Sequence, residues 1–401
     1  MLKKSLPPLL VIAEDFGYGS AGKLASVVER LECDVVLVGS DHAEHVIPEE
    51  RILDSHPDAR TAGSIASVAS EYDAHLALIS NTHPLSSEAS SAGLNTIFVD
   101  SLPFLWTEKD PVFHDPDVYC AQLCTAIPEL SWTTLRRIRH LVWVEAVIGS
   151  TPPRVPAAQT DSFVLLNFGG VATHLLPLEE SAYPALVLEA ALEAIEATDH
   201  KKVVVTGNLH RPHLEPVLER HPKLDVALAP ADHASMMKLL GQCEVLLTSP
   251  GLTMILEAGA ADVPTILLPP QNVSQFLNAD WVRTAGGDRG IVEWPQSVIS
   301  REQLDEVRWE GEDAALEFVY GRISEAGASA KSHVAVEVRR ALSSPHETLR
   351  GVTRYIEVVG SRGAEQVAAH VQELLRRPDV PVQRAHRESL PIARSTRSNS
   401  V

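Results

Sequence analysis

Residues 8–39, PLLVIAEDFGYGSAGKLASVVERLECDVVLVG, contain two short apolar runs separated by a glycine-rich loop and an amphipathic segment. The apolar runs, 8–13 and 34–39, are continuous rather than alternating, as in strands that are buried on both faces of a parallel sheet. Between them, apolar residues recur at helical spacing from Leu24 to Leu31. The stretch therefore predicts a strand, a loop, a helix and a second strand of a parallel sheet.

The same alternation of apolar runs and helical patterns continues on both sides of a proline-rich segment at 150–156. Proline interrupts regular elements, so this segment is typical of a linker between domains. The remaining apolar runs are 75–80, 95–100, 140–148, 163–168, 202–206, 225–228, 244–248 and 264–268. The sequence predicts an α/β protein with two Rossmann-like, doubly wound domains, over 1–150 and 160–300.

The length and composition fit this organisation. A chain of 401 residues with 45% hydrophobic and 22% charged residues is long enough for two globular cores. After about residue 300 the patterns are helical only, which predicts a helical C-terminal region over 301–378. Residues 379–401 are rich in Arg, Ser and Pro, and we expect a flexible tail there because they bury too little apolar surface to offset the entropy of ordering.

The charge excludes some classes of partner. Asp and Glu number 53 against 34 Lys and Arg, giving a formal net charge of −19, which disfavours nucleic acid or an anionic membrane surface and favours small-molecule partners. The apolar run at 9–13 is too short for a signal peptide or a membrane span, so we expect a cytoplasmic protein. The oligomeric state stays open, with a homodimer as one candidate.

We expect neither disulfides nor a metal site. The chain has only four Cys, and Cys120 and Cys124 have the spacing of one helix face without further ligands in register. Two His pairs, His42 with His45 and His210 with His213, likewise lack an evident third ligand. Packing and solvation explain these residues best, and no cofactor is indicated.

The stretch 244–279, EVLLTSPGLTMILEAGAADVPTILLPPQNVSQFLNA, carries most of the functional information. Its first strand delivers Ser249 and Gly251 to a turn at the sheet edge, and Thr253 opens the next helix, whose unpaired N–H groups favour a phosphate. Glu257 lies one helical turn further on and could accept hydrogen bonds from ribose hydroxyls. Any one of these features alone is equally typical of an ordinary capped turn.

Further polar residues follow other predicted strands. The amides of Gln271, Asn272 and Gln275 can both donate to and accept from sugar hydroxyls. The Gly169-Gly170 pair, in Asn-Phe-Gly-Gly, allows close backbone approach after a strand. Arg211 could neutralise a phosphate, although it also fits an ordinary loop arginine. The candidate donor-binding residues are therefore Gly169, Gly170, Arg211, Ser249, Gly251, Thr253, Glu257, Gln271, Asn272 and Gln275.

This series of residues resembles the donor-binding segment of the GT-B glycosyltransferases, which include the peptidoglycan N-acetylglucosaminyltransferase and antibiotic-tailoring enzymes. The resemblance implies two Rossmann-like domains facing across a cleft, with the acceptor bound by the first and a nucleotide sugar by the second. It implies that Gly251 and Thr253 hold the diphosphate and that Glu257 holds the ribose. It also places Gln271, Asn272 and Gln275 beside the donor sugar, and implies a metal-independent reaction.

The acceptor side begins at the loop after the first strand, where the family commonly keeps a catalytic base. Glu14 and Asp15 stand there, and we favour Asp15 as the base, although capping of the following loop explains either residue about as well. The family often has His at this place, and His83 is the nearest substitute. The residues 17–19, Gly17, Tyr18 and Gly19, form a candidate acceptor or phosphate loop.

The amino-acid sequences of 9–31 and 249–260 are similar to those of the cytosylglucuronic acid synthases of peptidyl-nucleoside antibiotic biosynthesis. That narrower resemblance implies UDP-glucuronic acid as donor, cytosine or hydroxymethylcytosine as acceptor, and inversion at the anomeric carbon. A carboxylated donor sugar would need a cation or several N–H donors, for which Lys23, Arg211 and the loop 271–275 are candidates.

Two other classes remain as alternatives. Gly17, Gly19 and Gly22 have the G-x-G-x-x-G spacing of dinucleotide-binding loops, with Asp41 roughly where a ribose-binding acid would lie, which would indicate an NAD-dependent oxidoreductase. No dehydrogenase-like catalytic set follows downstream. The same architecture could also belong to another natural-product or cell-wall GT-B transferase, or to a UDP-sugar epimerase-like enzyme.

Overall fold

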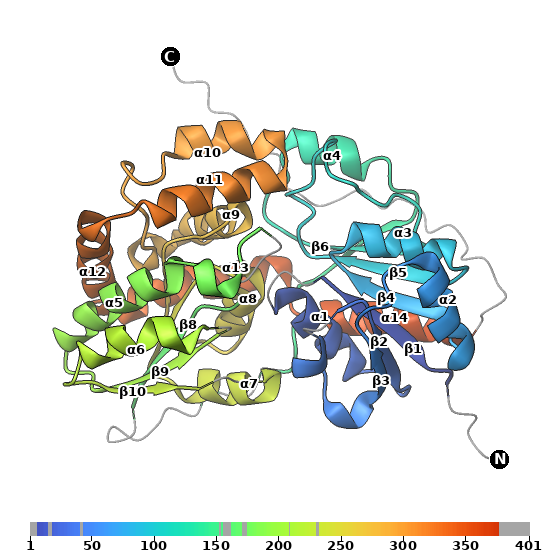
Figure 1. Cartoon of the computed structure of the whole chain (residues 1–401), viewed down its shortest axis with the longest axis horizontal. Helices are drawn as coiled ribbons and strands as arrows, with labels where there is room; N and C mark the ends of the chain where they lie inside the picture. The colour runs from blue at the N-terminus through green and yellow to red at the C-terminus, as the bar shows by residue number, and fades with distance from the viewer. Residues whose placement is uncertain are drawn as a thin grey trace.

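The computed structural model describes the chain from residue 6 to residue 376 with short gaps, and the backbone alone for 345–349. The gaps are 15–17, 41–42, 152–153, 155–161, 171–174, 208 and 230–231. The tail expected at 379–401 and most of the linker expected at 150–156 lie outside the described residues. Within the described part, the strands form two separate parallel sheets, each flanked by helices (Figure 1).

The first sheet has seven described strands in the order β3-β2-β1-β4-β5-β6-β7, all parallel. They are β1 (Leu9–Ala13), β2 (Val35–Val38), β3 (Ile52–His56), β4 (Leu76–Ser80), β5 (Asn95–Asp100), β6 (Val118–Gln122) and β7 (Leu141–Val144). The run predicted at 140–148 is a shorter strand than expected, and β3 and β6 were not predicted. The expected helical spacing of Cys120 and Cys124 is wrong, because Cys120 lies in β6 and every residue of that strand is buried in the sheet.

Helices cover both faces of this sheet, and β1 shows why its apolar run is continuous. Leu9 and Val11 belong to the core on the side of α1, whereas Leu10 and Ile12 pack with residues of α2 and α3 on the other side. Successive side chains of a strand point to opposite faces, so a doubly covered strand must be apolar at every position. The described helices here are α1 (Gly19–Val28), η1 (Ala43–His45), η2 (Glu49–Arg51), α2 (Ala62–Glu71), α3 (His83–Ser91) and α4 (Glu129–Leu135).

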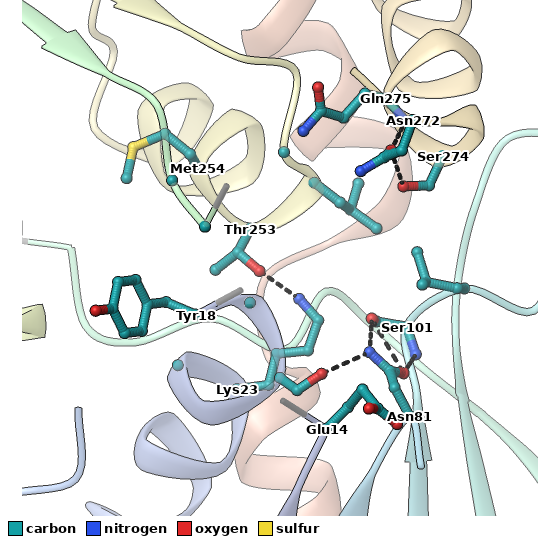
Figure 2. A pocket seen from close by; sticks show the side chains of 18 of the residues that line it. Glu14, Tyr18, Lys23, Asn81, Ser101, Thr253, Met254, Asn272, Ser274 and Gln275 are labelled. Carbon is teal, nitrogen blue, oxygen red and sulfur yellow. Dashed lines mark hydrogen bonds between the residues drawn. The ribbon is translucent and has the colours of Figure 1, made fainter. Parts of the chain in front are cut away.

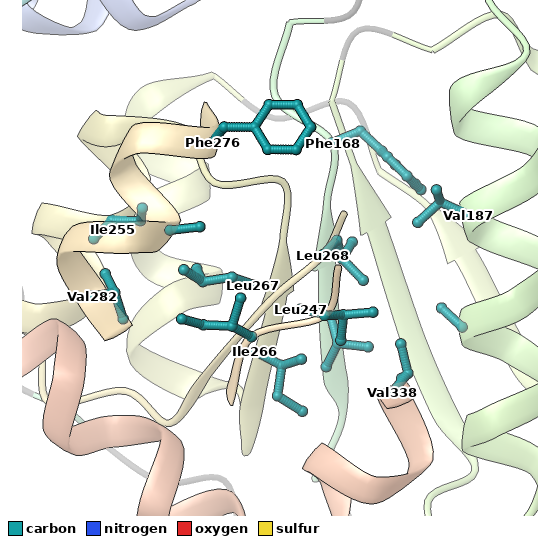
Figure 3. Close-up of a cluster of buried hydrophobic side chains, with 14 of the residues drawn as sticks. Phe168, Val187, Leu247, Ile255, Ile266, Leu267, Leu268, Phe276, Val282 and Val338 are labelled. Atoms are coloured by element: carbon teal, nitrogen blue, oxygen red, sulfur yellow. The ribbon is translucent and has the colours of Figure 1, made fainter. Parts of the chain in front are cut away.

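The second sheet has five described strands in the order β10-β9-β8-β11-β12, again all parallel. They are β8 (Val164–Asn167), β9 (Lys202–Thr206), β10 (Asp225–Leu228), β11 (Val245–Thr248) and β12 (Thr265–Leu267). The flanking helices are η3 (Leu178–Glu180), α5 (Tyr183–Glu196), α6 (Arg211–Glu219), α7 (His233–Gln242), α8 (Leu252–Ala260) and α9 (Val273–Val282). Figure 3 shows Leu247 and Ile266 of the sheet packed with Val187 of α5, Phe276 of α9 and Val338 of a later helix.

The helical C-terminal region divides its helices between the two sheets (Figure 1). After α9 come the short η4 (Arg283–Gly287) and η5 (Asp288–Gly290), and the helical region then contains α10 (Arg301–Val307), η6 (Arg308–Glu310), α11 (Glu312–Ser324), α12 (Ala328–Leu342), α13 (Pro345–Val359) and α14 (Gly363–Arg376). α12 packs on α5 and α13 on α8, both beside the second sheet. α14 returns to the first sheet, where Ala364, Val367 and Val371 join the core beneath α1.

The chain crosses between the two sheets twice, and the crossings lie side by side at Glu145. The Glu145 carboxylate accepts hydrogen bonds from the backbone N–H groups of Ser361 and Arg362, at 3.0 and 2.9 Å, and from the Arg362 guanidinium at 2.8 Å. These bonds hold the pKa of the Glu145 carboxyl below its usual range, with the Arg362 hydrogen bond as the largest cause. The end of β7 and the start of α14 are thereby fixed to each other.

The described residues contain no helix with the length and apolar character that a bilayer crossing requires. They also contain no group of three or more His, Cys, Asp or Glu side chains arranged to hold a metal ion. Of the two His pairs, His210 and His213 stack edge to face with ring centroids 4.6 Å apart, while His42 lies outside the described residues.

Candidate active site

A cavity of about 1010 Å³ lies where the carboxyl ends of the two sheets face each other (Figure 2). Glu14 and Asn81 follow β1 and β4 of the first sheet, and Gly169 and Ser249 follow β8 and β11 of the second. In each sheet these two strands are neighbours at which the strand order reverses direction. Ligands of open α/β sheets bind at such switch points, so the cavity has the position expected of a substrate site.

Lys23 of α1 reaches across the cavity to the second sheet. Its side chain is 1% exposed, and Nζ donates a hydrogen bond to Thr253 Oγ1 of α8 at 2.7 Å. Figure 2 shows the two side chains pointing toward each other from opposite walls. Burial lowers the pKa of Lys23 to about 8, and the nearby Glu257 carboxylate partly opposes that shift. At neutral pH the cavity therefore holds a largely cationic, poorly hydrated ammonium group.

Glu257, one turn beyond Thr253, is 2% exposed and pairs with His233 of α7. The distance from Glu257 Oε1 to His233 Nε2 is 3.1 Å. Burial raises the pKa of Glu257, while His233 and Lys23 act in the opposite direction. Both side chains line the cavity, so the ribose contact predicted for Glu257 requires a hydroxyl to approach a carboxylate that already has one partner.

The first turn of α8 lacks a side-chain cap, unlike the first turns of α7, α9 and α10. Its N-cap residue, Gly251, supplies no side-chain acceptor. By contrast, Asp232 caps α7, Asn272 caps α9 and Ser300 caps α10 through their side chains. The N–H groups at a helix start are hydrogen-bond donors with a partial positive charge. In α8 they lie beside Thr253 and Lys23, and the combination favours an anion.

The polar loop 271–275 is held mainly by its own hydrogen bonds. Asn272 Oδ1 accepts from Gln275 N–H at 3.0 Å, and Gln275 Oε1 accepts from Gln271 N–H at 3.0 Å. Asn272 and Gln275 line the cavity, whereas Gln271 donates to the Gly170 carbonyl at 3.4 Å and does not line it. Asn278, one turn further along α9, also lines the cavity and its Oδ1 has no partner among the described residues.

The turn after β8 brings the backbone of Gly169 to the cavity. Gly169 has φ 64°, in the left-handed region that glycine adopts most readily. Its N–H donates to Asn167 Oδ1 at 3.1 Å, and the hydroxyl of Ser249 donates to the Phe168 carbonyl at 2.8 Å. The ends of β8 and β11 are thus tied together directly beneath the start of α8.

The wall formed by the first sheet is also ordered by side chains. Asn81, with φ 61°, donates to Ser20 Oγ and to Ser101 Oγ, each at 3.0 Å. His83, two residues later, is 2% exposed and accepts the Phe113 N–H at Nδ1, at 3.3 Å. These contacts join the start of α1 and the loops after β4 and β5 into one surface.

A segment of the C-terminal helical region completes the cavity. Gly311, Glu312 and Asp313, at the start of α11, line it together with Glu14 and Asp110. Burial raises the pKa of Glu312 to about 7, and the charges of Asp110, Glu14 and Asp313 act in the same direction. A carboxyl group in this range can exchange a proton near neutral pH.

Comparison with known proteins agrees with this architecture. Residues 151–311 match a family model described as CGA synthase-related protein, and no curated protein sequence matches the chain. Among solved structures, S. aureus MnaA with UDP aligns with a TM-score of 0.54 and 12% identity, over 92% of this chain and 97% of that one. Phytolacca americana UGT2, complexed with UDP-2fluoro-glucose and pterostilbene, aligns with a TM-score of 0.52 and 12% identity, over 92% of this chain and 100% of that one. The spinosyn forosaminyltransferase SpnP aligns with a TM-score of 0.52 and 10% identity, over 93% of this chain and 100% of that one.

The chain has the GT-B fold. The fold predicted from the sequence is therefore confirmed. At these levels of identity the likeness concerns the fold alone, so the activity must be argued from the site.

The GT-B cavity brings together most of the predicted site residues. Those that line it are Glu14, Tyr18, Gly19, His83, Gly169, Gly170, Ser249, Gly251, Thr253, Glu257, Asn272 and Gln275. Arg211 is the exposed first residue of α6 and does not line the cavity, and neither does Gln271. Asp15, Gly17 and Asp41 lie outside the described residues.

The sequence interpretation missed several lining residues. These are Asn81, Ser101, Trp106, His233, Asn278 and Glu312. Asn81 and Ser101 directly follow strands β4 and β5, so their positions at strand ends could have indicated them. Glu312 lies in a region where only helical periodicity was visible, and nothing local indicated its place in the site.

Proposed function

We propose that the protein is an inverting glycosyltransferase that moves a sugar from a UDP-sugar to a small nitrogen acceptor. The observation that carries this proposal is the meeting of Lys23 with the first turn of α8 in the cavity, with Nζ 2.7 Å from Thr253 Oγ1. A buried cation beside the free N–H groups of a helix start is suited to two phosphoryl groups. No bound metal is needed for that role.

We further propose UDP-glucuronic acid as the donor and cytosine or hydroxymethylcytosine as the acceptor. The support is the match of 151–311 to the CGA synthase-related model, which agrees with the resemblance of 9–31 and 249–260 to cytosylglucuronic acid synthases. The cavity, about 1010 Å³, has room for a nucleotide sugar and a second small ring. Solved relatives of the same fold contain UDP or UDP-2fluoro-glucose.

In this mechanism the acceptor nitrogen attacks the anomeric carbon from the side opposite the diphosphate. The new C–N bond forms as the C–O bond to the diphosphate breaks, and the electron pair of that bond passes to the leaving oxygen. Lys23 and the N–H groups at the start of α8 stabilise the charge that develops there. Asp15, the base favoured from the sequence, lies outside the described residues, so we assign the proton of the acceptor nitrogen to the carboxylate of its neighbour Glu14, which follows β1 and lines the cavity.

The proposed function is tested by UDP binding and by a donor and acceptor screen. We expect UDP at about 100 times its Kd to stabilise the protein by roughly 2.7 kcal/mol, raising Tm, whereas NAD has no effect. UDP release from UDP-glucuronic acid should require cytosine or hydroxymethylcytosine, with the product identified by mass spectrometry. Glu14→Gln should lower kcat by about 10²–10⁴-fold while leaving UDP affinity unchanged.

Three results would reject parts of this proposal. Stabilisation by NAD and not by UDP would indicate the oxidoreductase alternative. Conversion of the UDP-sugar to another UDP-sugar without an acceptor would indicate an epimerase-like enzyme. Full turnover in Glu14→Gln would remove the assigned proton acceptor.

Lys23 predicts a specific pH dependence of UDP binding. About one unit below its pKa of about 8 the ammonium is already charged in the free protein, so UDP affinity should change little up to about pH 7 and begin to fall as the pH approaches 8. Above that pKa, binding of the anion must take up a proton, so affinity should fall by up to about tenfold per pH unit. Calorimetric titrations to about pH 9 measure this fall. Lys23→Arg, whose charge does not titrate in this range, should remove it, and an equal fall in that variant would contradict the assignment.

A further inference from the structure

His83 is an unusual histidine because its surroundings fix it as a hydrogen-bond donor. Its ring stacks on Phe98 with centroids 4.4 Å apart and meets Trp106 edge to face at 4.7 Å. The Phe113 N–H occupies Nδ1, so the neutral ring carries its own proton on Nε2. Burial lowers the pKa of His83 to about 3, and the charge of His114 acts in the same direction, so the ring stays neutral. It is therefore unsuited to be a base.

The Nε2 atom of His83 has no partner among the described residues, although it is buried. The residue lines the cavity and is 2% exposed. Buried N–H groups in proteins are nearly always satisfied, so an unpartnered N–H on a residue that lines a binding cavity points to an acceptor atom on a ligand. The neighbouring Trp106 ring is itself fixed, because its Nε1 donates to Asp100 at 3.0 Å.

Carboxylates from both halves of the protein line the same part of the cavity. Glu14 directly follows β1, and Glu312 lies in the first turn of α11. Asp110 lies near them but is already bound, since its Oδ2 accepts from the Thr107 N–H and hydroxyl at 2.7 and 2.8 Å. Lys109 is paired with Glu310. Together with Asp110, Glu14 and Glu312 give this wall an acidic character.

We propose that His83, Glu14 and Glu312 form the acceptor subsite, and that it takes a planar ring presenting a carbonyl oxygen to His83 and N–H groups to the two carboxylates. The inference rests on the proposed function and adds how the acceptor is recognised. Glu312 is supplied by the helical region that follows the second sheet, so the subsite is complete only when both halves of the chain face each other.

This arrangement selects among small heterocycles. An aminated ring such as cytosine offers the N–H groups that the carboxylates accept and the carbonyl that His83 Nε2–H donates to. A ring with a carbonyl in place of the amine, such as uracil, would direct an oxygen at a carboxylate and should be rejected. Sites built around such polar groups discriminate strongly against a ligand that leaves them unpaired.

Cytosine and uracil titrated separately into the UDP-saturated protein at about pH 8, above the pKa of about 7 of Glu312, test the subsite by calorimetry with that group ionised. Cytosine should bind at least about tenfold more tightly than uracil. Glu312→Gln keeps the size of the side chain but replaces an acceptor oxygen with a donor, and it should weaken cytosine at least about tenfold with UDP affinity unchanged. Glu317→Gln, on an exposed part of the same helix and away from the cavity, is the matched control and should bind cytosine as the wild type does.

A second variant tests the hydrogen-bond donor that His83 contributes to the subsite. His83→Phe preserves an aromatic ring between Phe98 and Trp106 but lacks both the Nε2–H donor and the Nδ1 acceptor of the Phe113 N–H, and it should also lose about tenfold or more in cytosine affinity. Cytosine affinity unchanged in both Glu312→Gln and His83→Phe, with UDP still bound, would overturn the subsite and leave the proposed function standing. Absence of UDP binding in the wild type would instead reject the proposed function. The cytosine titration is repeated without UDP, and cytosine that fails to bind under either condition also overturns the subsite.

Discussion

Lys23→Met is expected to lower kcat/KM for the UDP-sugar by on the order of 10²–10³-fold and to weaken UDP binding. Methionine has nearly the same length, so it can occupy the 1% exposed position without opening a cavity. It removes the ammonium that lies 2.7 Å from Thr253 Oγ1, which in the proposed mechanism neutralises the departing diphosphate. Steady-state kinetics with UDP release, together with calorimetric UDP titration, measure both effects.

Lys331→Met provides the control for this substitution. Lys331 of α12 is also a lysine paired with a carboxylate, Glu189, at 3.0 Å, but it lies outside the cavity lining. We expect the kcat/KM and UDP affinity of Lys331→Met to stay within about twofold of the wild type, because partly exposed ion pairs contribute little to stability. Wild-type UDP affinity and turnover in Lys23→Met would show that the diphosphate binds elsewhere, and the argument from the start of α8 would fail.

The sequence was sufficient for the strands of the second sheet because each is a continuous apolar run between turn residues. It was less informative for β3 and β6. β3 lies at the edge of its sheet and is partly exposed, so ILDSH lacks an apolar pattern, and β6 is a five-residue run with Cys and Gln in it. Short runs of this kind do not separate strand from helix or loop by periodicity alone.

The cavity shows the same division between local and distant information. Gly251, Thr253 and Glu257 were predicted together because they lie within one strand, turn and helix, whose geometry is set locally. Glu312 could not be predicted, because its neighbour Glu14 is about 300 residues away in the sequence and only packing of α11 against the cavity brings them together. Helical periodicity indicates that a helix has a buried side without indicating what covers it.

The return of α14 to the first sheet also could not be predicted from the sequence. Its apolar stripe predicted a helix, but no pattern in the sequence chose between the two sheets. The choice depends on the backbone at the crossing, where Gly363 N–H donates to the Ala146 carbonyl at 3.1 Å.

Gly363→Ala should lower the free energy of unfolding by on the order of 3 kcal/mol. A Cβ atom on Gly363 would lie 2.0 Å from the carbonyl oxygen of Glu145 and 2.8 Å from that of Ala146. Both atoms belong to the backbone of the first crossing, so neither can rotate away as a flexible side chain would. Relief requires α14 to move off the first sheet, which also loosens its core beneath α1. Urea unfolding followed by circular dichroism measures the loss.

Gly321→Ala is the control for that substitution, because a Cβ on Gly321 meets nothing within 4 Å and the residue lies inside α11. There the exchange should raise the free energy of unfolding by about 0.5–1 kcal/mol, since alanine favours the helix. Opposite signs for the same exchange would separate the close crossing from the general effect of replacing glycine. Equal stability of Gly363→Ala and the wild type would mean that the two crossings are not in contact, and the start of α14 would then not be fixed to the end of β7.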